Sequence, residues 1–138
     1  MNEIDYRIDA PLADSTLNAL FGRAWADHVS RPFQHVLARS LGTVSAFVDD
    51  RLIGFVNLAT DGGGHAFLLE PTVDPAHQRR GIGLSLVERA VAVARARGCR
   101  WLHVDYEVRL EPFYLAAGFR PSSAGIMRLD RPPDEHRS

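Results

Sequence analysis

A short stretch of the sequence, Gln78-Arg79-Arg80-Gly81-Ile82-Gly83, has the residue types of an anion-binding turn. Glycines at 81 and 83 would let a ligand approach the backbone closely, and a helix that begins here presents unpaired N–H groups. Arginines at a helix N-terminus cost about 0.3–1 kcal/mol each unless an anion is bound. The turn therefore predicts a phosphate site, with a solvated turn as the alternative. It lacks the third glycine and the later acidic residue of a dinucleotide fingerprint.

Acidic and histidine side chains on two expected strands are candidates for proton transfer. Glu70 lies inside the segment 65–73, where a charged carboxylate is costly unless it has a partner or a function. Strand alternation places Asp105 on the same face as His103. His65 and His103 are alternative bases, and an ordinary outward-facing carboxylate is the plainer interpretation of Glu70. The residues alone leave the base open.

All sixteen basic residues are arginine, and lysine is absent. This absence excludes a P-loop and a pyridoxal Schiff base, because each needs a lysine, and it excludes a protein kinase for the same reason. The single cysteine, Cys99, cannot form an intrachain disulfide. The six histidines show no metal-ligand spacing. No metal is therefore expected, and Cys99 is interpreted as a structural thiol.

The length of 138 residues fits one domain, and the net charge of −1 gives no support to nucleic-acid binding. No apolar run approaches the ~18 residues of a membrane span, and the N-terminus lacks a signal-peptide pattern. We expect a cytoplasmic protein without a membrane partner. A single domain is expected over residues 1–131, and a disordered tail over 132–138.

The positions of glycine and of apolar residues predict the elements that carry these groups. Helical spacing predicts a first helix over 13–25, with Asp14 or Ser15 as N-cap. A second, short helix is expected within 32–41, with Phe33, Val36 and Leu37 facing inward. Alternation predicts a strand at 6–8 and a hairpin of 43–48 with 52–60 around Asp49-Asp50. Later segments are a strand at 65–73, a helix at 81–97 ended by Gly98, a strand at 101–106, a helix at 111–117 and a last strand at 126–130. The strand, helix and strand from 65 to 106 form a β-α-β unit, so the fold class is α/β, or α+β by some conventions.

Two motifs resemble the GNAT superfamily of acyl-CoA-dependent N-acyltransferases. Residues 78–83 match its signature Q/R-x-x-G-x-G/A, and Thr72-Val73-Asp74-Pro75 resembles the strand end that leads into it. The stretch Phe113-Tyr114-Leu115-Ala116-Ala117-Gly118-Phe119 is similar to the family's second motif. The resemblance runs from about residue 10 to residue 129. It implies a mixed, mostly antiparallel sheet with a central, splayed pair of parallel strands, flanked by helices.

The resemblance also implies a co-substrate and where it lies. Acetyl-CoA would lie between the strands that end near Val73 and Tyr106, with its pantetheine arm on the backbone of Thr72 and Val73. Pro71 suits an interrupted ladder because it has no N–H. The resemblance implies that the cofactor also contacts the turn, at Gln78, Arg79, Arg80, Gly81, Ile82, Gly83, Leu84 and Ser85. The pyrophosphate would lie on the backbone amides from residue 79 onward.

The same resemblance implies a direct attack of an amine on the thioester, with Tyr114 as the acid for the leaving thiolate and Glu70 as the leading candidate base. Glu107 stands where many family members have an asparagine. Together with Glu70 and Asp105 it favours a small cationic amine as acceptor, with Trp25, His28 and Phe33 as candidate lining. Transfer to a protein N-terminus or lysine and a non-catalytic acyl-CoA sensor are the alternatives. The oligomeric state is left open, with a homodimer as one alternative.

Overall fold

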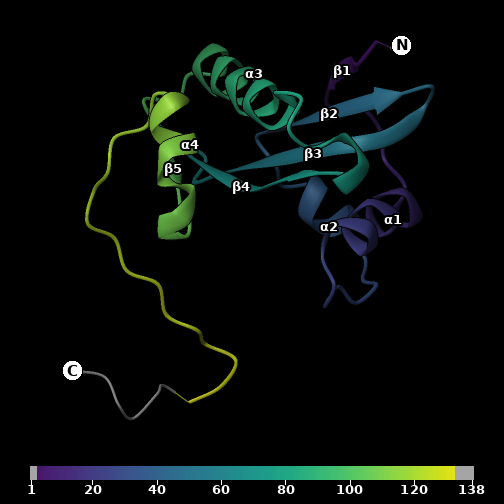
Figure 1. The fold of residues 1–138 in the computed structure, drawn as a ribbon. Coiled ribbons are helices and arrows are strands. Elements are labelled where there is room, and N and C mark those ends of the chain that lie inside the picture. Colours follow the sequence, from purple (N-terminus) through teal and green to yellow (C-terminus); the bar gives the residue numbers. More distant parts are fainter. Residues whose placement is uncertain (1–2, 133–138) are drawn as a thin grey trace.

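The computed structural model describes residues 3–132, which form one five-stranded sheet in the order β1-β2-β3-β4-β5 (Figure 1). Neighbouring strands are antiparallel from β1 to β4, and β4 pairs with β5 in parallel. This is the mixed, mostly antiparallel sheet predicted from the sequence. The strands are β1 (Asp5–Ile8), β2 (Gly42–Val48), β3 (Arg51–Thr60), β4 (His65–Val73) and β5 (Trp101–Val104).

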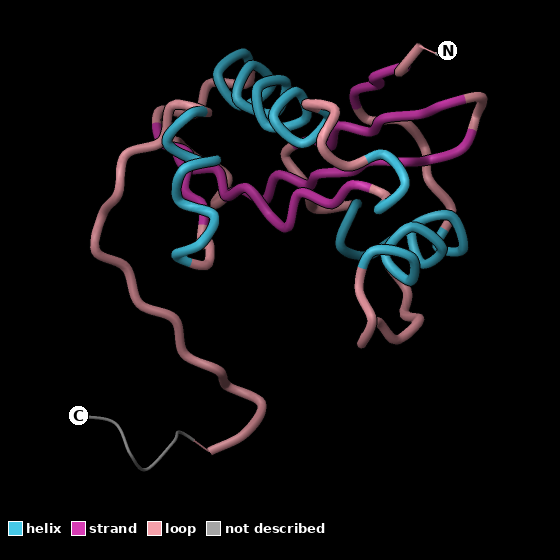
Figure 2. Tube along the Cα trace, in the orientation of Figure 1, coloured by secondary structure: helices cyan, strands magenta, loops and turns pink. Residues whose placement is uncertain are grey.

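Helices cover both faces of this sheet (Figures 1 and 2). One face packs against α3, and the opposite face of the N-terminal strands packs against α1. The α-helices are α1 (Asp14–Ala24), α2 (Gln34–Leu37), α3 (Ile82–Ala96) and α4 (Glu111–Ala116), and the short 3-10 turns are η1 (Pro75–His77) and η2 (Val108–Leu110).

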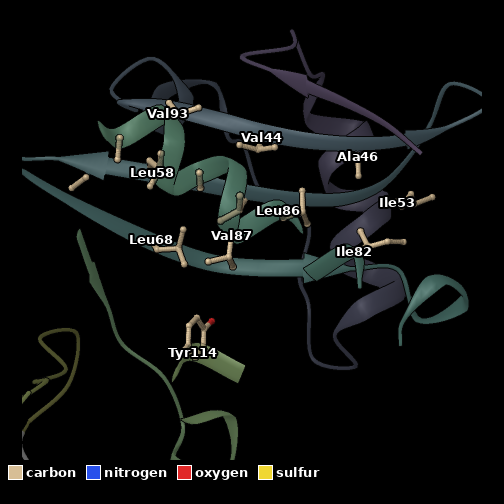
Figure 3. Packing of buried hydrophobic residues seen from close by; sticks show 14 residues of the cluster. Val44, Ala46, Ile53, Leu58, Leu68, Ile82, Leu86, Val87, Val93 and Tyr114 are labelled. Carbon is tan, nitrogen blue, oxygen red and sulfur yellow. The ribbon is translucent and has the colours of Figure 1, made fainter. Parts of the chain in front are cut away.

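The main core lies between α3 and the sheet. Leu86, Val87 and Ala90 recur at helical spacing and are fully buried, so the helix presents one apolar stripe to the strands. Figure 3 shows Val44 and Leu58 from the strands in the same interior as this stripe. A second core on the other face joins α1 to the hairpin of β2 and β3.

Two predicted local features occur at the expected positions. Asp49 and Asp50, which link β2 to β3, have φ of 48° and 64°. Two successive left-handed residues match the twist of a tight hairpin, and aspartate tolerates that conformation better than most residues. Gly98 follows α3 with φ of 89°, as a glycine does when it ends a helix.

The first two helices differ from the prediction at their ends. Ala13, rather than Asp14 or Ser15, is the N-cap of α1, and it makes no side-chain cap. The Asp14 carboxylate instead accepts hydrogen bonds from the Phe33 backbone and the Gln34 side chain. The second helix, α2, is only four residues long, and Val36 is exposed rather than inward. The carboxylate of Asp14 thus binds the start of α2, a tertiary contact that the local sequence does not reveal.

The C-terminal part also differs from the prediction. Residues 126–130 are not a strand in the structure, and β5 ends at Val104 instead of 106. The chain after α4 has no regular structure through residue 132 and leaves the body of the molecule (Figures 1 and 2). The expected tail at 132–138 lies almost entirely outside the described residues. A strand needs a partner for its backbone groups, and within the described part of this chain residues 126–130 have none.

Among residues 3–132, no helix combines the length and the apolar character needed to cross a membrane. The same residues contain no cluster of three or more histidine, cysteine or acidic side chains arranged to hold a metal ion.

Candidate cofactor and acceptor site

The central feature of the site is the end of β4, where its pairing with β5 stops. The parallel ladder joins His65 to Trp101 and ends at Leu68 and Val104, whereas β4 continues to Val73. Residues 69–73 therefore have no β5 partner among the described residues. An unpaired strand edge offers N–H and C=O groups to a ligand. This opening is the splay that the resemblance implied.

A β-bulge marks the same place. In the pairing of β3 with β4, Asn57 faces Leu69 and Phe55 faces Thr72, so β4 has an extra residue at Glu70 and Pro71. Glu70 has φ of 46°, a left-handed conformation that is costly for a residue with a side chain. The Thr72 hydroxyl donates to the Glu70 carbonyl at 2.8 Å and so closes the bulge.

The bulge determines where the predicted β4 residues point. Thr72 is 2% exposed and belongs to the α1 face, since its partner Phe55 packs in the second core. Val73 packs against the α3 core. The side chain of Glu70 is exposed. The cost of a buried charge, on which the sequence argument for Glu70 depended, therefore does not apply at this position.

The glycine turn connects β4 to α3. Gly81 is the N-cap of α3 with φ of 76°, and Arg79 two residues earlier has φ of 65°. The first bond within the helix runs from Ser85 N to Gly81 O. The N–H groups of Ile82, Gly83 and Leu84 thus have no partner from the helix. They form the positive end of a fifteen-residue helix dipole.

The charges around this helix start favour an anion. No acidic residue lies in the first turn of α3. Arg79 and Arg80 are exposed, and no hydrogen bond or ion pair joins either side chain to another described residue. Gln78, by contrast, is held by a bond from its amide nitrogen to Val73 O at 3.1 Å. The two arginines are thus available to a ligand, whereas Gln78 supports the turn.

The two glycines of the motif differ in the space around them. A Cβ at Gly81 would meet nothing within 4 Å, so only its positive φ calls for glycine. A Cβ at Gly83 would lie 3.6 Å from the Phe113 ring and 3.8 Å from Val73, which is ordinary contact. The fold therefore tolerates a side chain at 83. A close approach of a ligand to the backbone is the remaining reason for glycine at this position.

Asp74 fastens this turn to the rest of the fold, a role that the sequence analysis missed. Its carboxylate is almost fully buried, accepts from Ala76 N at 2.9 Å and pairs with Arg23 of α1 at 2.6 Å. Burial disfavours the charged form, but these hydrogen bonds outweigh it and lower the pKa of Asp74 below its usual value. The Asp-Pro step predicts a turn, whereas the pairing with Arg23 spans 51 positions and has no local signal.

Tyr114 of α4 lies in the same cluster of buried residues as Ile82, the first residue of α3. Its ring is buried against Tyr106 at 4.8 Å between centroids and meets Phe113 and Phe119 edge-on. Figure 3 shows the hydroxyl directed away from α4, toward the side on which β4 and α3 lie. The hydroxyl has no hydrogen bond to a described residue, yet it is not among the fully buried unpaired atoms. Burial raises the pKa of the Tyr114 phenol, so the phenol stays protonated at neutral pH.

Tyr106, which the sequence analysis used only to mark a strand end, belongs to the same aromatic group. Its ring stacks on Tyr114, and its hydroxyl donates to Glu111 Oε1 at 3.4 Å. Desolvation and the neighbouring Glu111 raise the pKa of the Tyr106 phenol. The stack holds the Tyr114 ring in position from the β5 side.

The acidic candidates on the β5 side are exposed. Asp105 and Glu107 both face solvent, and Glu107 pairs with Arg109 at 2.9 Å. The charge of Glu107 is therefore partly compensated, whereas no partner from the described residues is recorded for Asp105. The alternative bases lie along the paired part of β4 and β5: His65 Nδ1 and His103 Nε2 are 2.8 Å apart, and Phe67 stacks on His103.

The residues expected to line the acceptor side lie in an aromatic group around Phe21. Trp25 stacks on Phe21 at 4.7 Å, and His28 bonds to Asn18 at 2.8 Å. Phe33 is 6% exposed and packs in the second core, so its side chain serves packing. Cys99 is half-buried against the α3 core, which fits the structural thiol expected from the sequence.

The overall fold of this chain is shared by solved acetyltransferases. A GNAT-family acetyltransferase of Streptococcus pneumoniae TIGR4 superposes with a TM-score of 0.80 at 21% identity, over 94% of this chain and all of that one. An aminoglycoside N-acetyltransferase in complex with CoA superposes with a TM-score of 0.73 at 19% identity, over 95% and 97% of the two chains. These likenesses establish the fold.

The family model of the acetyltransferase (GNAT) family matches residues 11–119, so the chain belongs to that family. A mycothiol acetyltransferase of Nocardia farcinica (strain IFM 10152) is 34% identical over 105 residues. The match covers 72% of this chain and 34% of that relative, so this chain spans about a third of its length.

Proposed function

We propose that this protein is an acetyl-CoA-dependent N-acetyltransferase that acts on a small cationic amine. The observation that carries the proposal is the open backbone of β4 at residues 69–73, which ends at Val73 in the same packed cluster as Ile82 at the start of α3 and Tyr114 of α4. The similarity to a mycothiol acetyltransferase and to a CoA-bound aminoglycoside acetyltransferase supports this choice.

The donor groups of the site suit a thioester of coenzyme A. The N–H groups of Ile82, Gly83 and Leu84 point out of the helix start, and Arg79 and Arg80 add positive charge, as a pyrophosphate requires. The unpaired edge of β4 offers amide groups of the kind that a pantetheine arm can pair with. The glycine at 83 leaves the backbone open to close approach.

The proposed chemistry is a direct acyl transfer. The acceptor nitrogen reacts as a neutral amine, after its ammonium form has given one proton to solvent. Acetyl-CoA, when bound, supplies a thioester: the nitrogen forms a bond to its carbonyl carbon, and the carbon–sulfur bond breaks. The phenol of Tyr114 gives its proton to the departing sulfur. Glu70, on the exposed bulge at the mouth of the opening, takes the second proton that the nitrogen loses. Glu70 then releases this proton to solvent, and the phenol recovers one from solvent.

The charge of the acceptor follows from the exposed carboxylates. Glu70 and Asp105 both lie at the end of the strand pair and face solvent. Glu107 contributes less, because Arg109 neutralises part of its charge. The negative potential of these carboxylates attracts a cationic amine and raises its local concentration.

An activity assay across an amine panel tests the proposal. We expect thiol release from acetyl-CoA with amino sugars or polyamines, and weaker release with neutral or acidic amines. A lysine peptide and a peptide N-terminus belong in the panel, because transfer to protein is the alternative acceptor class. Failure of acetyl-CoA to bind would contradict the proposed function. Release with acidic acceptors only would contradict the proposed charge preference.

The Tyr114→Phe variant tests the acid. We expect kcat to fall by about 10²–10⁴-fold, while acetyl-CoA affinity stays unchanged, because the ring and its packing remain. Tyr6→Phe on β1 is the matched control and should keep full activity, since Tyr6 lies at the far edge of the sheet. An active Tyr114→Phe enzyme would remove Tyr114 from the acid role.

A non-catalytic acyl-CoA sensor is the second candidate, and one observation favours it. Glu107 occupies a position where an amide is common in the family, and its carboxylate is held by Arg109 at 2.9 Å. Acetyl-CoA binding without thiol release for any amine in the panel would favour the sensor over the enzyme.

A further inference from the structure

The face of the sheet opposite α3 is open where β4 meets β5. Residues 66 and 68 of β4 and 102 and 104 of β5 pack toward α3, so the residues between them point to the opposite face. On that face α1 packs over the hairpin of β2 and β3. The part over β4 and β5 is exposed, with Phe67 at 38% and Trp101 at 58%. We call its ring-bearing residues the aromatic shelf: His65, Phe67, Trp101 and His103.

Three rings of the aromatic shelf form a stack. The His103 ring is stacked on both neighbours, with its centroid 5.0 Å from that of His65 and 4.7 Å from that of Phe67. The hydrogen bond of 2.8 Å between His65 Nδ1 and His103 Nε2 holds the two imidazoles together. Among the described residues, Phe67 has a stacked ring on one side only. Because stacked rings attract each other at centroid distances of about 4.5–7 Å, the other side of Phe67 can take a further flat ring.

The shelf ends at the opening between β4 and β5. The last parallel pair joins Leu68 to Val104, so Leu69 and Asp105 are the first residues on the two sides of the opening. Alternation places both on the face of the shelf, and both are exposed. Phe67 and Leu69 are two residues apart on one strand, which is about 6–7 Å at 3.3 Å per residue. A ring on Phe67 therefore lies one row of side chains from the opening.

The groups proposed to bind the cofactor lie on the other face of the sheet. The amides at the start of α3 and the ring of Tyr114 belong to the α3 side. A thioester that reaches the opening from that side leaves the shelf face free for the second substrate. The reacting amine then lies at the opening, near Asp105 and the bulge at Glu70. The rest of the acceptor extends over the shelf.

We infer, on the basis of the proposed function, that the acceptor is an amine with a flat aromatic ring two or three carbons from its nitrogen. The ring stacks on Phe67 and contacts Leu69, whose side chain is 41% exposed. The carboxylate of Asp105 attracts the ammonium form in which the amine arrives. Phe67 and Leu69 therefore determine specificity for the ring, whereas Asp105 recognises only the charge. Polyamines and amino sugars have the charge without the flat apolar ring, so they are weaker acceptors.

Kinetics with a matched series of amines gives the primary test. The series is propylamine, benzylamine, 2-phenylethylamine and 2-cyclohexylethylamine, which differ in the presence, the spacing and the flatness of the ring. We expect kcat/KM for 2-phenylethylamine to exceed that for propylamine by about tenfold or more, because the ring is both stacked and withdrawn from water. Benzylamine should be weaker, since its nitrogen does not reach the opening. Propylamine or 2-cyclohexylethylamine performing as well as 2-phenylethylamine would overturn the inference.

Variants locate the preference on the shelf. Phe67→Ala should raise KM for 2-phenylethylamine by about tenfold and leave propylamine unchanged, because only the ring loses its partner. Phe67→Leu keeps an apolar side chain and should show the same selective loss. Ile8→Ala is the matched control, since Ile8 is 44% exposed and lies on β1 at the far edge of the sheet. Asp105→Asn should raise KM for both amines by a similar factor. An unchanged ring preference in both Phe67 variants would overturn the assignment.

Binding measurements separate this inference from the proposed function. Calorimetry with CoA-loaded protein compares the affinities for 2-phenylethylamine and propylamine without turnover. If no amine releases thiol from acetyl-CoA, the proposed function fails, and tighter binding of 2-phenylethylamine that is lost in Phe67→Ala would still support the shelf as its site. Equal affinities for the two amines would overturn the shelf whether or not acetyl transfer occurs.

Discussion

The centre of the sheet and its β5 edge differ in how completely they are buried. In the centre, the buried half of the sheet, residues 42–47 of β2 and 52–58 of β3 are buried without interruption, covered by α3 on one face and by α1 on the other. In the C-terminal half, β5 alternates between exposed and half-buried residues. The exposed large apolar residues from 101 onward are Trp101, Val108, Leu115, Ile126, Met127 and Leu129.

The two parts of the sheet therefore have different roles, one in stability and the other in the candidate site. The buried half supplies stability, since each apolar side chain there is withdrawn from water. The open half begins where β4 leaves β5, and it contains the unpaired strand edge, Tyr114 and the exposed carboxylates. The candidate site thus lies at the boundary, where one strand still belongs to the core and its neighbour no longer does. Substitutions on the two sides should therefore have different effects.

The largest contrast is expected for matched leucines. Leu86→Ala in the core should lower the free energy of unfolding by about 2–5 kcal/mol, because it leaves a cavity between α3 and the sheet. Leu115→Ala on α4, where the side chain is 47% exposed, should cost well under half as much. Urea unfolding of both variants checks this. Similar losses would contradict the contrast between the buried half and the open half.

The next contrast concerns two ion pairs. Asp74→Asn should cost about 1.5–3 kcal/mol, because it weakens a charge-assisted bond to Arg23 at a buried carboxylate. Asp5→Asn, which affects the exposed pair with Arg7, should cost about 0–1 kcal/mol. Thermal or urea unfolding at neutral pH measures both. Equal costs would contradict the role of Asp74 in fastening the cofactor turn to α1.

The same carboxylate predicts a pH dependence. The folded-state pKa of Asp74 is lowered relative to the unfolded value of about 3.9. Its contribution to stability is therefore fully present above that value and is lost as the pH falls through the folded-state pKa. The stability difference between wild type and Asp74→Asn should shrink on acidification below pH about 4. A difference that stayed constant to low pH would show that the charge of Asp74 is not what stabilises the turn.

The smallest expected effects distinguish the two glycines of the motif. Gly81→Ala should destabilise the fold by about 1–2 kcal/mol, since alanine is strained at a φ of 76°. Gly83→Ala should leave stability unchanged or raise it by up to about 0.5–1 kcal/mol, because alanine is the better helix former and its Cβ has room. Acetyl-CoA binding by Gly83→Ala should nevertheless weaken, and calorimetry can measure it. Unchanged binding would show that no ligand approaches the backbone there.

The buried half was predicted from the sequence more accurately than the open half, and for a physical reason. Alternation and helical spacing report burial, so β4, α3 and the glycine at 98 were placed within a residue or two. The strand predicted at residues 126–130 is absent, because pairing needs a neighbour and none of the described residues supplies it. The Asp74–Arg23 pair and the stack of Tyr106 on Tyr114 depend on tertiary contacts that a local pattern does not report.

The bulge at Glu70 and Pro71 also affects how this strand tolerates change in length. Because side chains alternate along a strand, the extra residue inverts the alternation beyond it: Leu68 faces α3, and Thr72 four positions later faces α1. Substitution at position 71 alters one side chain, whereas deletion of that residue would remove the bulge and leave Thr72 opposite Phe55, still facing α1. The bulge is thus a one-residue insertion that the flanking pairing absorbs, and a homologous strand one residue shorter would keep the same side chains on the same faces.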